Sequence, residues 1–272
     1  MHLATAGAVR HPSVWALAAA ALLSAACARG PSPPPLVPAS AAGTVVLPPD
    51  YDPARAYPVV EILPATGSTA GTLLQIWLSR VGLGRLYADP PERQLAALRP
   101  YLLPDTGAGS RGFILVLVKG RGSADDYRSA EAWSRTIARY EAQVLADLAT
   151  LAAHRRVDTT RMVVAGFSLG GDLAWAITLR HPRLLHGAVV MASRASYRPD
   201  PAGADALAAR GVRFVLTMGD RDDRTRQRLA RAAAQALDRW GVANRFQVLP
   251  GAGHEPAPPE VFAEALKFVL AR

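Results

Sequence analysis

The chain has 272 residues, enough for one large domain that buries its own core without disulfides or metal. Hydrophobic residues make up 50% and charged residues 19%, a composition that excludes a disordered chain. Its single cysteine, Cys27, excludes an internal disulfide framework and a cysteine-rich metal centre. The formal net charge is +9, but the arginines form no basic stripe and no nucleic-acid-binding motif, so we expect no nucleic-acid partner.

Residues 1–27 have the pattern of an export signal. Arg10 precedes an apolar run from Val14 to Ala26, which is too short to span a bilayer comfortably and ends in small residues. Cys27 follows directly, an arrangement that resembles the lipobox of bacterial lipoproteins, with Ser24 where that motif usually has leucine. We expect an envelope protein anchored through acylated Cys27. Ordinary signal cleavage would instead leave a soluble periplasmic or secreted protein.

Residues 28–42 are rich in proline and predict an extended linker. From residue 43 onward, strand and helix patterns alternate. Short apolar runs bounded by Gly, Pro or Asp are typical of buried parallel strands, and they lie at 59–63, 113–118, 162–165, 187–192, 212–218 and 246–249.

Apolar residues at helical spacing fill the intervals between these runs, for example from Ile137 to Leu151 and from Leu229 to Trp240, and a last helix begins near Pro259. The alternation predicts one α/β domain over residues 43–272, with a mostly parallel sheet and helices on both faces. Residues 70–112 interrupt it with Gly and Pro breaks around two short amphipathic segments. We expect this segment to leave the sheet as a flap over the site.

The most informative motif follows the strand expected at 162–165. Residues 166–170 read Gly-Phe-Ser-Leu-Gly and lead into an apolar helix that ends near His181. Between a strand and a helix, the two glycines permit a sharp turn that exposes the serine hydroxyl above the sheet edge. Ser168 is therefore the predicted nucleophile.

A serine hydroxyl needs a base within hydrogen-bond reach. The predicted base is His254, which follows the last expected strand in a glycine-containing loop. The other five histidines lie in the export signal, at the ends of expected helices or in the turn before a strand. No two histidines have metal-ligand spacing, so we expect no metal and no cofactor.

The base in turn needs a carboxylate that orients it. The strand expected at 212–218 is followed by three candidates, Asp220, Asp222 and Asp223, which spacing alone does not separate. With any of them, the chain order Ser–Asp–His is that of the α/β-hydrolases and differs from the orders of trypsin-like and subtilisin-like enzymes.

These motifs resemble the α/β-hydrolase superfamily, most closely its carboxylesterase/phospholipase and feruloyl-esterase-like branches. The similar segments lie at 47–53, 157–158, 166–171, 219–222 and 251–254. The resemblance implies the α/β-hydrolase fold and places the acid three residues after the glycine, at Asp222. It also implies an oxyanion hole made by the backbone amides of Leu169 and Thr66, with Ala65 as the next choice. Here the chain departs from the family, because Pro64-Ala65-Thr66-Gly67 stands where His-Gly is usual.

A Ser168–Asp222–His254 triad predicts hydrolysis of small-molecule carboxylic esters through an acyl-enzyme. A serine peptidase or an acyltransferase would use the same groups. A catalytically silent envelope binding protein is the alternative from another functional class. The sequence leaves the oligomeric state open.

Three further residues are weaker candidates for the pocket. We expect Trp133 to belong to the core, and Asp172 to be a favourable charge at a helix N-terminus. Arg121 is a possible pocket-lining residue.

Overall fold

The structure is a computed structural model that describes residues 43–102 and 112–271. All of these residues belong to one compact unit, Val37–Arg272. The export signal and linker expected at residues 1–42, including Cys27, lie outside the described residues.

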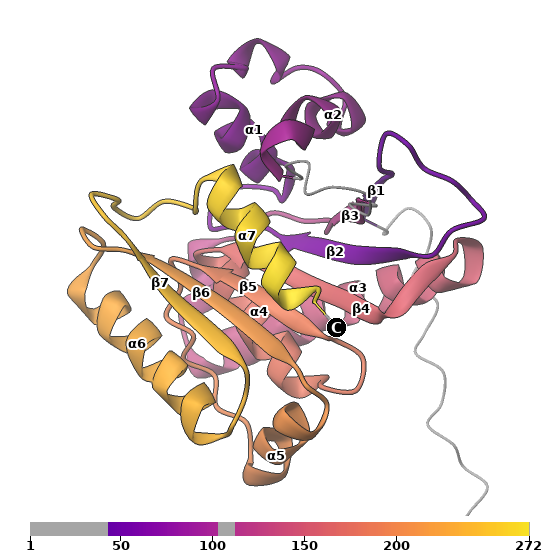
Figure 1. Cartoon of the computed structure of the whole chain (residues 1–272). Helices are drawn as coiled ribbons and strands as arrows, with labels where there is room; N and C mark the ends of the chain where they lie inside the picture. Colours follow the sequence, from indigo (N-terminus) through magenta and orange to yellow (C-terminus); the bar gives the residue numbers. More distant parts are fainter. Residues whose placement is uncertain (1–42, 103–111, 272) are drawn as a thin grey trace, which may run out of the picture. The chain divides into compact units, whose positions relative to one another are not determined.

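A seven-stranded sheet in the order β1-β3-β2-β4-β5-β6-β7 forms the centre of this unit (Figure 1). The strands are β1 (Thr44–Val46), β2 (Tyr57–Leu63), β3 (Ile114–Leu117), β4 (Val157–Phe167), β5 (Gly187–Met191), β6 (Arg213–Gly219) and β7 (Asn244–Leu249). All neighbours are parallel except β1, which runs antiparallel to β3. The α/β-hydrolase fold class expected from the sequence is confirmed.

The strands expected from the apolar runs are all present, and two features of the sheet were not predicted. Strand β1 has three residues, of which only Val46 is buried, so it carries no readable alternation. Strand β4 begins at Val157 rather than Met162 because its first residues are partly or fully exposed and lack the apolar signal.

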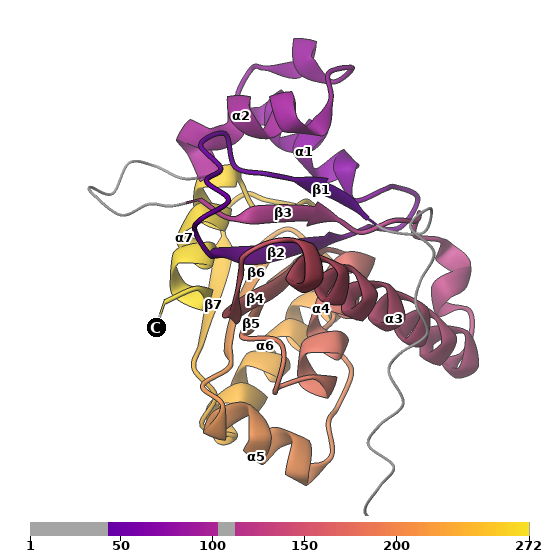
Figure 2. The same ribbon diagram turned by 90° about the vertical axis from the view of Figure 1, so that its right-hand side faces the viewer.

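Helices cover both faces of the sheet (Figures 1 and 2). They are α1 (Gly71–Arg80), α2 (Pro91–Leu102), α3 (Ala130–His154), α4 (Leu169–Arg180), α5 (Pro201–Ala209), α6 (Arg224–Arg239) and α7 (Pro259–Val269), with the short 3₁₀ helices η3 (Gly84–Leu86) and η4 (Ala124–Tyr127). One core cluster joins the sheet to α3, α4, α5 and α6, and the other joins it to α1, α2 and α7. Strand β2 supplies both clusters with alternating residues, Val59 and Leu63 to the first and Val60 and Ile62 to the second.

The two helices within residues 70–102 form part of the core, contrary to the expected flap. Helix α1 buries one face that includes Leu74 and Trp77, and α2 packs against both α1 and α7. Helix α1 also reaches the chain after β7, where the indole N–H of Trp77 donates to the carbonyl of Ala257 at 2.9 Å. Gly82 and Pro90 therefore lie in the connection between two packed helices, whereas residues 103–111 lie outside the described residues. None of the helices in the described ranges is both long and apolar enough to cross a membrane.

Candidate active site

Ser168 occupies a strained turn between β4 and α4. Its backbone has φ 55° and ψ −117°, a region that residues with side chains rarely adopt and that costs of the order of 1–3 kcal/mol. The amide of Ser168 donates to the carbonyl of Met191 at the end of β5, at 2.9 Å. The packing of β4, β5 and α4 thus holds the serine in a conformation that it would not adopt alone.

The flanking glycines of the motif are required by close backbone contacts. A Cβ atom on Gly166 would lie 2.3 Å from the carbonyl carbon of Gly170. One on Gly170 would lie 2.5 Å from the carbonyl oxygen of Leu63 in β2. Larger residues at these positions would push α4 away from the strands, so the Gly-x-Ser-x-Gly pattern reflects the tight crossing of helix and sheet.

Ser168, His254 and Asp222 form a continuous hydrogen-bonded chain. The Ser168 hydroxyl lies 2.9 Å from His254 Nε2, and His254 Nδ1 lies 2.9 Å from Asp222 Oδ2. With Asp222 ionised, Nδ1–H donates to the carboxylate and Nε2 is free to accept the serine proton. The structure therefore brings together the three residues that the sequence nominated, from the ends of β4, β6 and β7.

Of the three acids after β6, only Asp222 contacts the histidine. Asp220 accepts a hydrogen bond from the amide of Gly251 at 2.8 Å and so connects the loop after β6 to the loop that carries His254. Asp223 is the N-cap of α6 and accepts from the amide of Arg226 at 3.0 Å. Among the three acids, these contacts favour Asp222 as the residue that orients His254.

The Asp222 carboxylate is almost fully buried and fully hydrogen-bonded. Its Oδ1 atom accepts from Arg226 Nη1 and from the amide of Asp223, each at 2.6 Å, while Oδ2 faces His254. Burial by itself raises the pKa of Asp222, but the bonds from His254, Asp223 and Arg226 outweigh burial and hold the pKa below its usual range. Sequence reasoning missed Arg226. Its spacing of four from Asp222, across the start of an expected helix, was the available signal.

Asp172 anchors the loops on one side of the serine. It lies in the first turn of α4, as expected for a charge at a helix N-terminus, but it is only 4% exposed. The hydroxyls of Tyr127 and Ser193 each donate to it at 2.6 Å, and the amide of Ala195 donates at 2.9 Å. Burial, followed by the nearby Asp172 carboxylate, raises the pKa of Tyr127, which keeps this phenol a donor. Asp172 thus joins the segments after β3 and β5 to the helix that begins at the serine.

The other two pocket candidates have different surroundings. Trp133 stacks on Tyr127 with ring centroids 5.2 Å apart and packs against the core, as expected. Arg121 is exposed and pairs through its backbone with Thr69 in an isolated bridge.

The segments that carry Thr66 and Leu169 meet at Gly122. Thr66 forms an isolated bridge with Gly122. The amide that donates to the carbonyl of Gly122, at 2.9 Å, is that of Gly67 and not that of Thr66. A Cβ atom on Gly122 would lie 2.4 Å from the carbonyl oxygen of Ala65 and 2.7 Å from the side chain of Leu169. Leu169 is the first residue of α4, where amides lack partners within the helix. Both amides nominated for the oxyanion hole therefore belong to adjoining segments beside the serine.

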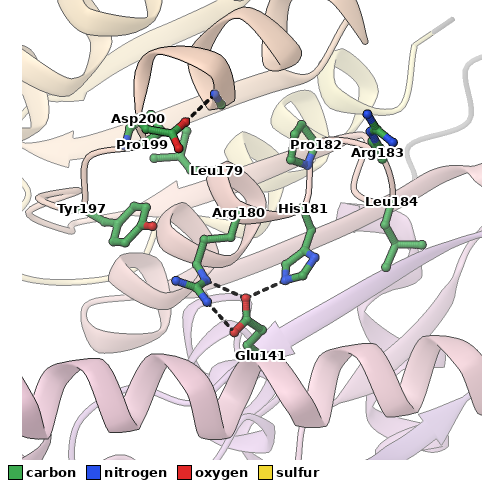
Figure 3. A pocket seen from close by; sticks show the side chains of 11 residues that line it. Glu141, Leu179, Arg180, His181, Pro182, Arg183, Leu184, Tyr197, Pro199 and Asp200 are labelled. Atoms are coloured by element: carbon green, nitrogen blue, oxygen red, sulfur yellow. Dashed lines mark hydrogen bonds and ion pairs between the residues drawn. The ribbon is translucent and has the colours of Figure 1, made fainter. Parts of the chain in front are cut away.

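A cavity with a volume of about 480 Å³ lies at the opposite end of α4 (Figure 3). From Ser168 to this end, α4 extends roughly 18 Å at 1.5 Å per residue. Figure 3 shows Arg180 and His181 converging on Glu141 of α3. Arg180 donates to both carboxylate oxygens, at 2.6 and 3.1 Å, and His181 Nε2 lies 2.5 Å from Oε1.

Burial raises the pKa of Glu141, but the bonds from His181 and Arg180 outweigh burial and lower it to about 2. The cluster therefore joins α3 to α4 with an ionised carboxylate. Within the residues that the structure describes, no group of three or more His, Cys, Asp or Glu side chains is placed to hold a metal ion.

Comparison with known proteins supports the esterase interpretation of this geometry. The model of a family described as "Putative esterase" matches residues 39–248. A ferulic acid esterase from the anaerobic fungus Anaeromyces mucronatus is similar in structure, with a TM-score of 0.56, 16% identity and coverage of 82% of each chain. The esterase PE8 matches with a TM-score of 0.52 and 19% identity, over 84% of this chain and 97% of its own.

A protein from Bacteroides ovatus described as a "putative dipeptidyl aminopeptidase IV" matches with a TM-score of 0.54 and 16% identity, over 83% of this chain but 32% of its own. At these identities the likeness to solved structures shows the shared fold. No curated protein matches the sequence.

Proposed function

Because the chain belongs to the esterase family and has the α/β-hydrolase fold, we propose that it hydrolyses carboxylic esters through an acyl-enzyme on Ser168. The observation that carries the proposal is the pair of 2.9 Å contacts that link Ser168 to His254 and His254 to Asp222. A hydroxyl aligned on an imidazole, itself oriented by a buried carboxylate, is the arrangement that activates serine as a nucleophile.

In the first half of the reaction, His254 Nε2 takes the proton of Ser168 as Oγ attacks the acyl carbon. Asp222 holds the imidazole in the required tautomer and stabilises its protonated form. The amides of Leu169 and Thr66 donate to the developing oxyanion, Ala65 being the next choice for the second donor. His254 then gives its proton to the leaving alcohol, which departs and leaves the acyl group on Ser168.

In the second half, a water molecule takes the place of the alcohol. His254 removes a proton from this water as its oxygen attacks the acyl carbon, and the same two amides stabilise the second oxyanion. Collapse of this intermediate returns the proton to Ser168 and releases the carboxylic acid. These steps need only side chains and amides of this chain.

The decisive experiment is covalent labelling with a fluorophosphonate, which reacts with activated serines. We expect one label, at Ser168, because among the described residues this is the serine hydroxyl that lies on a histidine nitrogen. Ser168→Ala should abolish labelling, whereas the exposed Ser196→Ala serves as the matched control and should label as the wild type does. A label that persists in Ser168→Ala would contradict the proposed nucleophile, and the absence of any label would favour the silent binding protein.

The proposed substrate is a small-molecule ester. Its support is the family, together with the likeness to a ferulic acid esterase whose structure has been solved in complex with ferulic acid. Initial rates on short-chain, long-chain and feruloyl esters, with peptides for comparison, test this proposal. Faster cleavage of peptides than of any ester would contradict it and favour a serine peptidase.

We further propose that the protein is exported and acylated at Cys27. The support is the sequence pattern of residues 1–27, an apolar run that ends in small residues before the cysteine. Cys27→Ser should move the protein from the membrane fraction to the soluble fraction. A mature N-terminus without lipid, measured by mass spectrometry, would contradict acylation and leave soluble export as the alternative.

A further inference from the structure

The first turn of α6 holds the loop after β6, residues 220–223, by side-chain and backbone contacts. Arg226 Nη1 and the amide of Asp223 both donate to Oδ1 of Asp222, each at 2.6 Å. Gln227 Nε2 donates to the backbone carbonyl of Asp222 at 2.6 Å and to that of Asp220 at 3.1 Å. These contacts occupy one carboxylate oxygen and hold the loop, so that the other oxygen, Oδ2, faces His254.

The Arg226–Asp222 ion pair is shielded from solvent. The side chain of Asp222 is 1% exposed and that of Arg226 is 18% exposed. Charges in such surroundings interact more strongly than a surface pair, because little water screens them. Removal of the charge at Arg226 should therefore change the electrostatic potential at the carboxylate and at the imidazole bound to it.

Few other charged groups face this pair among the described residues. From the loop after β7, His254 binds Oδ2, and its ring packs on Phe167 at a centroid distance of 4.9 Å. Asp223 turns its carboxylate to the amide of Arg226. From η4, the hydroxyl of Tyr127 is close enough to feel the charges of both Arg226 and Arg194, and Arg194 lies over the Tyr127 ring at 5.1 Å.

We propose that Arg226 is a positioning residue of the triad, which holds Oδ2 of Asp222 toward His254 and weakens the attraction of that carboxylate for a protonated imidazole. This inference rests on the proposed function of Ser168, His254 and Asp222. The guanidinium thus offsets part of the negative charge that the imidazole faces.

Two substitutions separate charge from geometry, and a third is the control. Arg226→Gln keeps a hydrogen-bond donor but removes the charge, whereas Arg226→Lys keeps the charge but loses the planar guanidinium. Arg228→Gln removes an equal charge from an exposed position two residues further along the same helix. Circular dichroism and thermal unfolding of each variant establish that the comparison is between folded proteins.

The first measurement is the pH dependence of kcat/KM for a chromogenic ester. In Arg226→Gln, the midpoint of the acidic limb should rise by roughly 0.5–1 pH unit, since a shielded positive charge near the imidazole is lost. Arg226→Lys should keep the wild-type midpoint to within about 0.2 unit but lower kcat, because the carboxylate is held less firmly. Arg228→Gln should match the wild type in both quantities.

The second measurement does not depend on ester hydrolysis. An NMR titration of the His254 ring, assigned by comparison with His254→Ala, should show the same upward movement of its midpoint in Arg226→Gln. If the wild type hydrolyses no ester, the proposed function fails, but the titration still decides the inference about Arg226.

A folded Arg226→Gln protein whose His254 midpoint is unchanged would overturn the proposal, even if its kcat fell, because a purely structural role moves no midpoint. If the glutamine variant does not fold, Arg226→Lys decides. A raised His254 midpoint in Arg226→Lys, which keeps the positive charge, would show that this charge does not determine the midpoint. That result would also overturn the proposal.

Discussion

Two carboxylate–histidine pairs lie at opposite ends of α4, and they differ in what the histidine faces. At the N-terminal end, Asp222 binds Nδ1 of His254, and Nε2 of that ring lies 2.9 Å from the Ser168 hydroxyl. At the C-terminal end, Glu141 binds Nε2 of His181 and also both nitrogens offered by Arg180. The first pair has a serine hydroxyl aligned on the second ring nitrogen, and the second pair forms an ion-pair cluster with Arg180. A carboxylate–imidazole contact alone therefore does not indicate catalysis.

The backbone that carries each histidine explains this difference. His181 is the C-cap of α4 and reaches sideways to α3, so its contacts follow from helix packing. His254 lies in a loop after β7 that is held from two directions. Asp220 binds the amide of Gly251 before it, and Arg80 of α1 pairs with the adjacent Glu255. A loop anchored on both sides can point a ring at a serine that comes from another strand.

The sharpest test of this contrast is to remove each imidazole in turn. His254→Ala should lower kcat by about 10⁴–10⁶-fold, because Ser168 loses its base. His181→Ala should keep kcat within about twofold and lower only the free energy of unfolding, by about 1 kcal/mol, through the lost hydrogen bond to Glu141. Steady-state kinetics and urea unfolding measure the two effects. Equal losses of kcat in both variants would show that the C-terminal cluster takes part in turnover.

Substitution of the two aspartates after β6, Asp222 and Asp220, should give the next largest difference in kcat. Asp222→Asn should leave a folded protein with kcat reduced by about 10⁴-fold, because the imidazole loses its orienting charge. Asp220→Asn should have a smaller effect, about tenfold or less, because its side chain positions Gly251 and does not contact the ring. The comparison is made with kcat at a pH on the plateau of the wild-type profile. If Asp220→Asn loses more of its kcat than Asp222→Asn, the wrong carboxylate has been assigned to the triad.

Glu141→Gln should change stability and spare activity. The pKa of Glu141 is lowered to about 2 from an ordinary 4.5, so its ionised form stabilises the fold above pH 4.5. This contribution is lost as the pH falls from about 4.5 toward 2, because the unfolded chain then binds a proton that the folded chain does not. For Glu141→Gln we expect the free energy of unfolding at neutral pH to fall by about 1 kcal/mol, a value discounted for solvent screening. It should also depend less on pH in the acid range. Urea unfolding from pH 7 to pH 2.5 checks this. A variant as acid-sensitive as the wild type would contradict it.

A third buried carboxyl differs from these two because, among the described residues, it has no hydrogen-bond partner. Glu61 in β2 is fully buried, and neither carboxyl oxygen has a hydrogen-bond partner within the described part of the chain. Burial, with a smaller effect of Asp147, raises its pKa well above 4.5. The folded protein keeps this proton, so stability falls as the pH rises from 4.5 toward the raised pKa.

Glu61→Gln should therefore stabilise the protein above neutral pH, by less than about 1 kcal/mol since the buried amide is also unpaired. Thermal unfolding at pH 5 and pH 9 is the measurement, and Asp238→Asn on the surface of α6 is a control for the loss of one negative charge. A glutamine variant with the wild-type pH dependence would show that Glu61 is not the titrating group.

Much of the fold and the core of the candidate site were predictable because their signals are local. Doubly buried parallel strands require continuous apolar runs, and a helix requires apolar residues every three or four positions, so both appear within short windows. The turn around Ser168 was equally readable, since Gly166 and Gly170 are dictated by backbone contacts that admit no side chain. Loop position after a strand likewise nominated His254.

The remaining features depend on contacts between distant parts of the chain. Ser168 and His254 are 86 residues apart, and Asp222 and His254 are 32 apart, so which of three neighbouring acids meets the ring is decided by the packing of β6, β7 and α6. Asp172 reaches across to Tyr127, 45 residues away, for the same reason. The placement of α1 and α2 in the core also depended on how they pack against α7. The sequence by itself determined the elements and the residue types of the triad, because these follow from local periodicity and backbone sterics. Only the tertiary structure decided their partners, among them Arg226, because side-chain contacts depend on how the elements assemble.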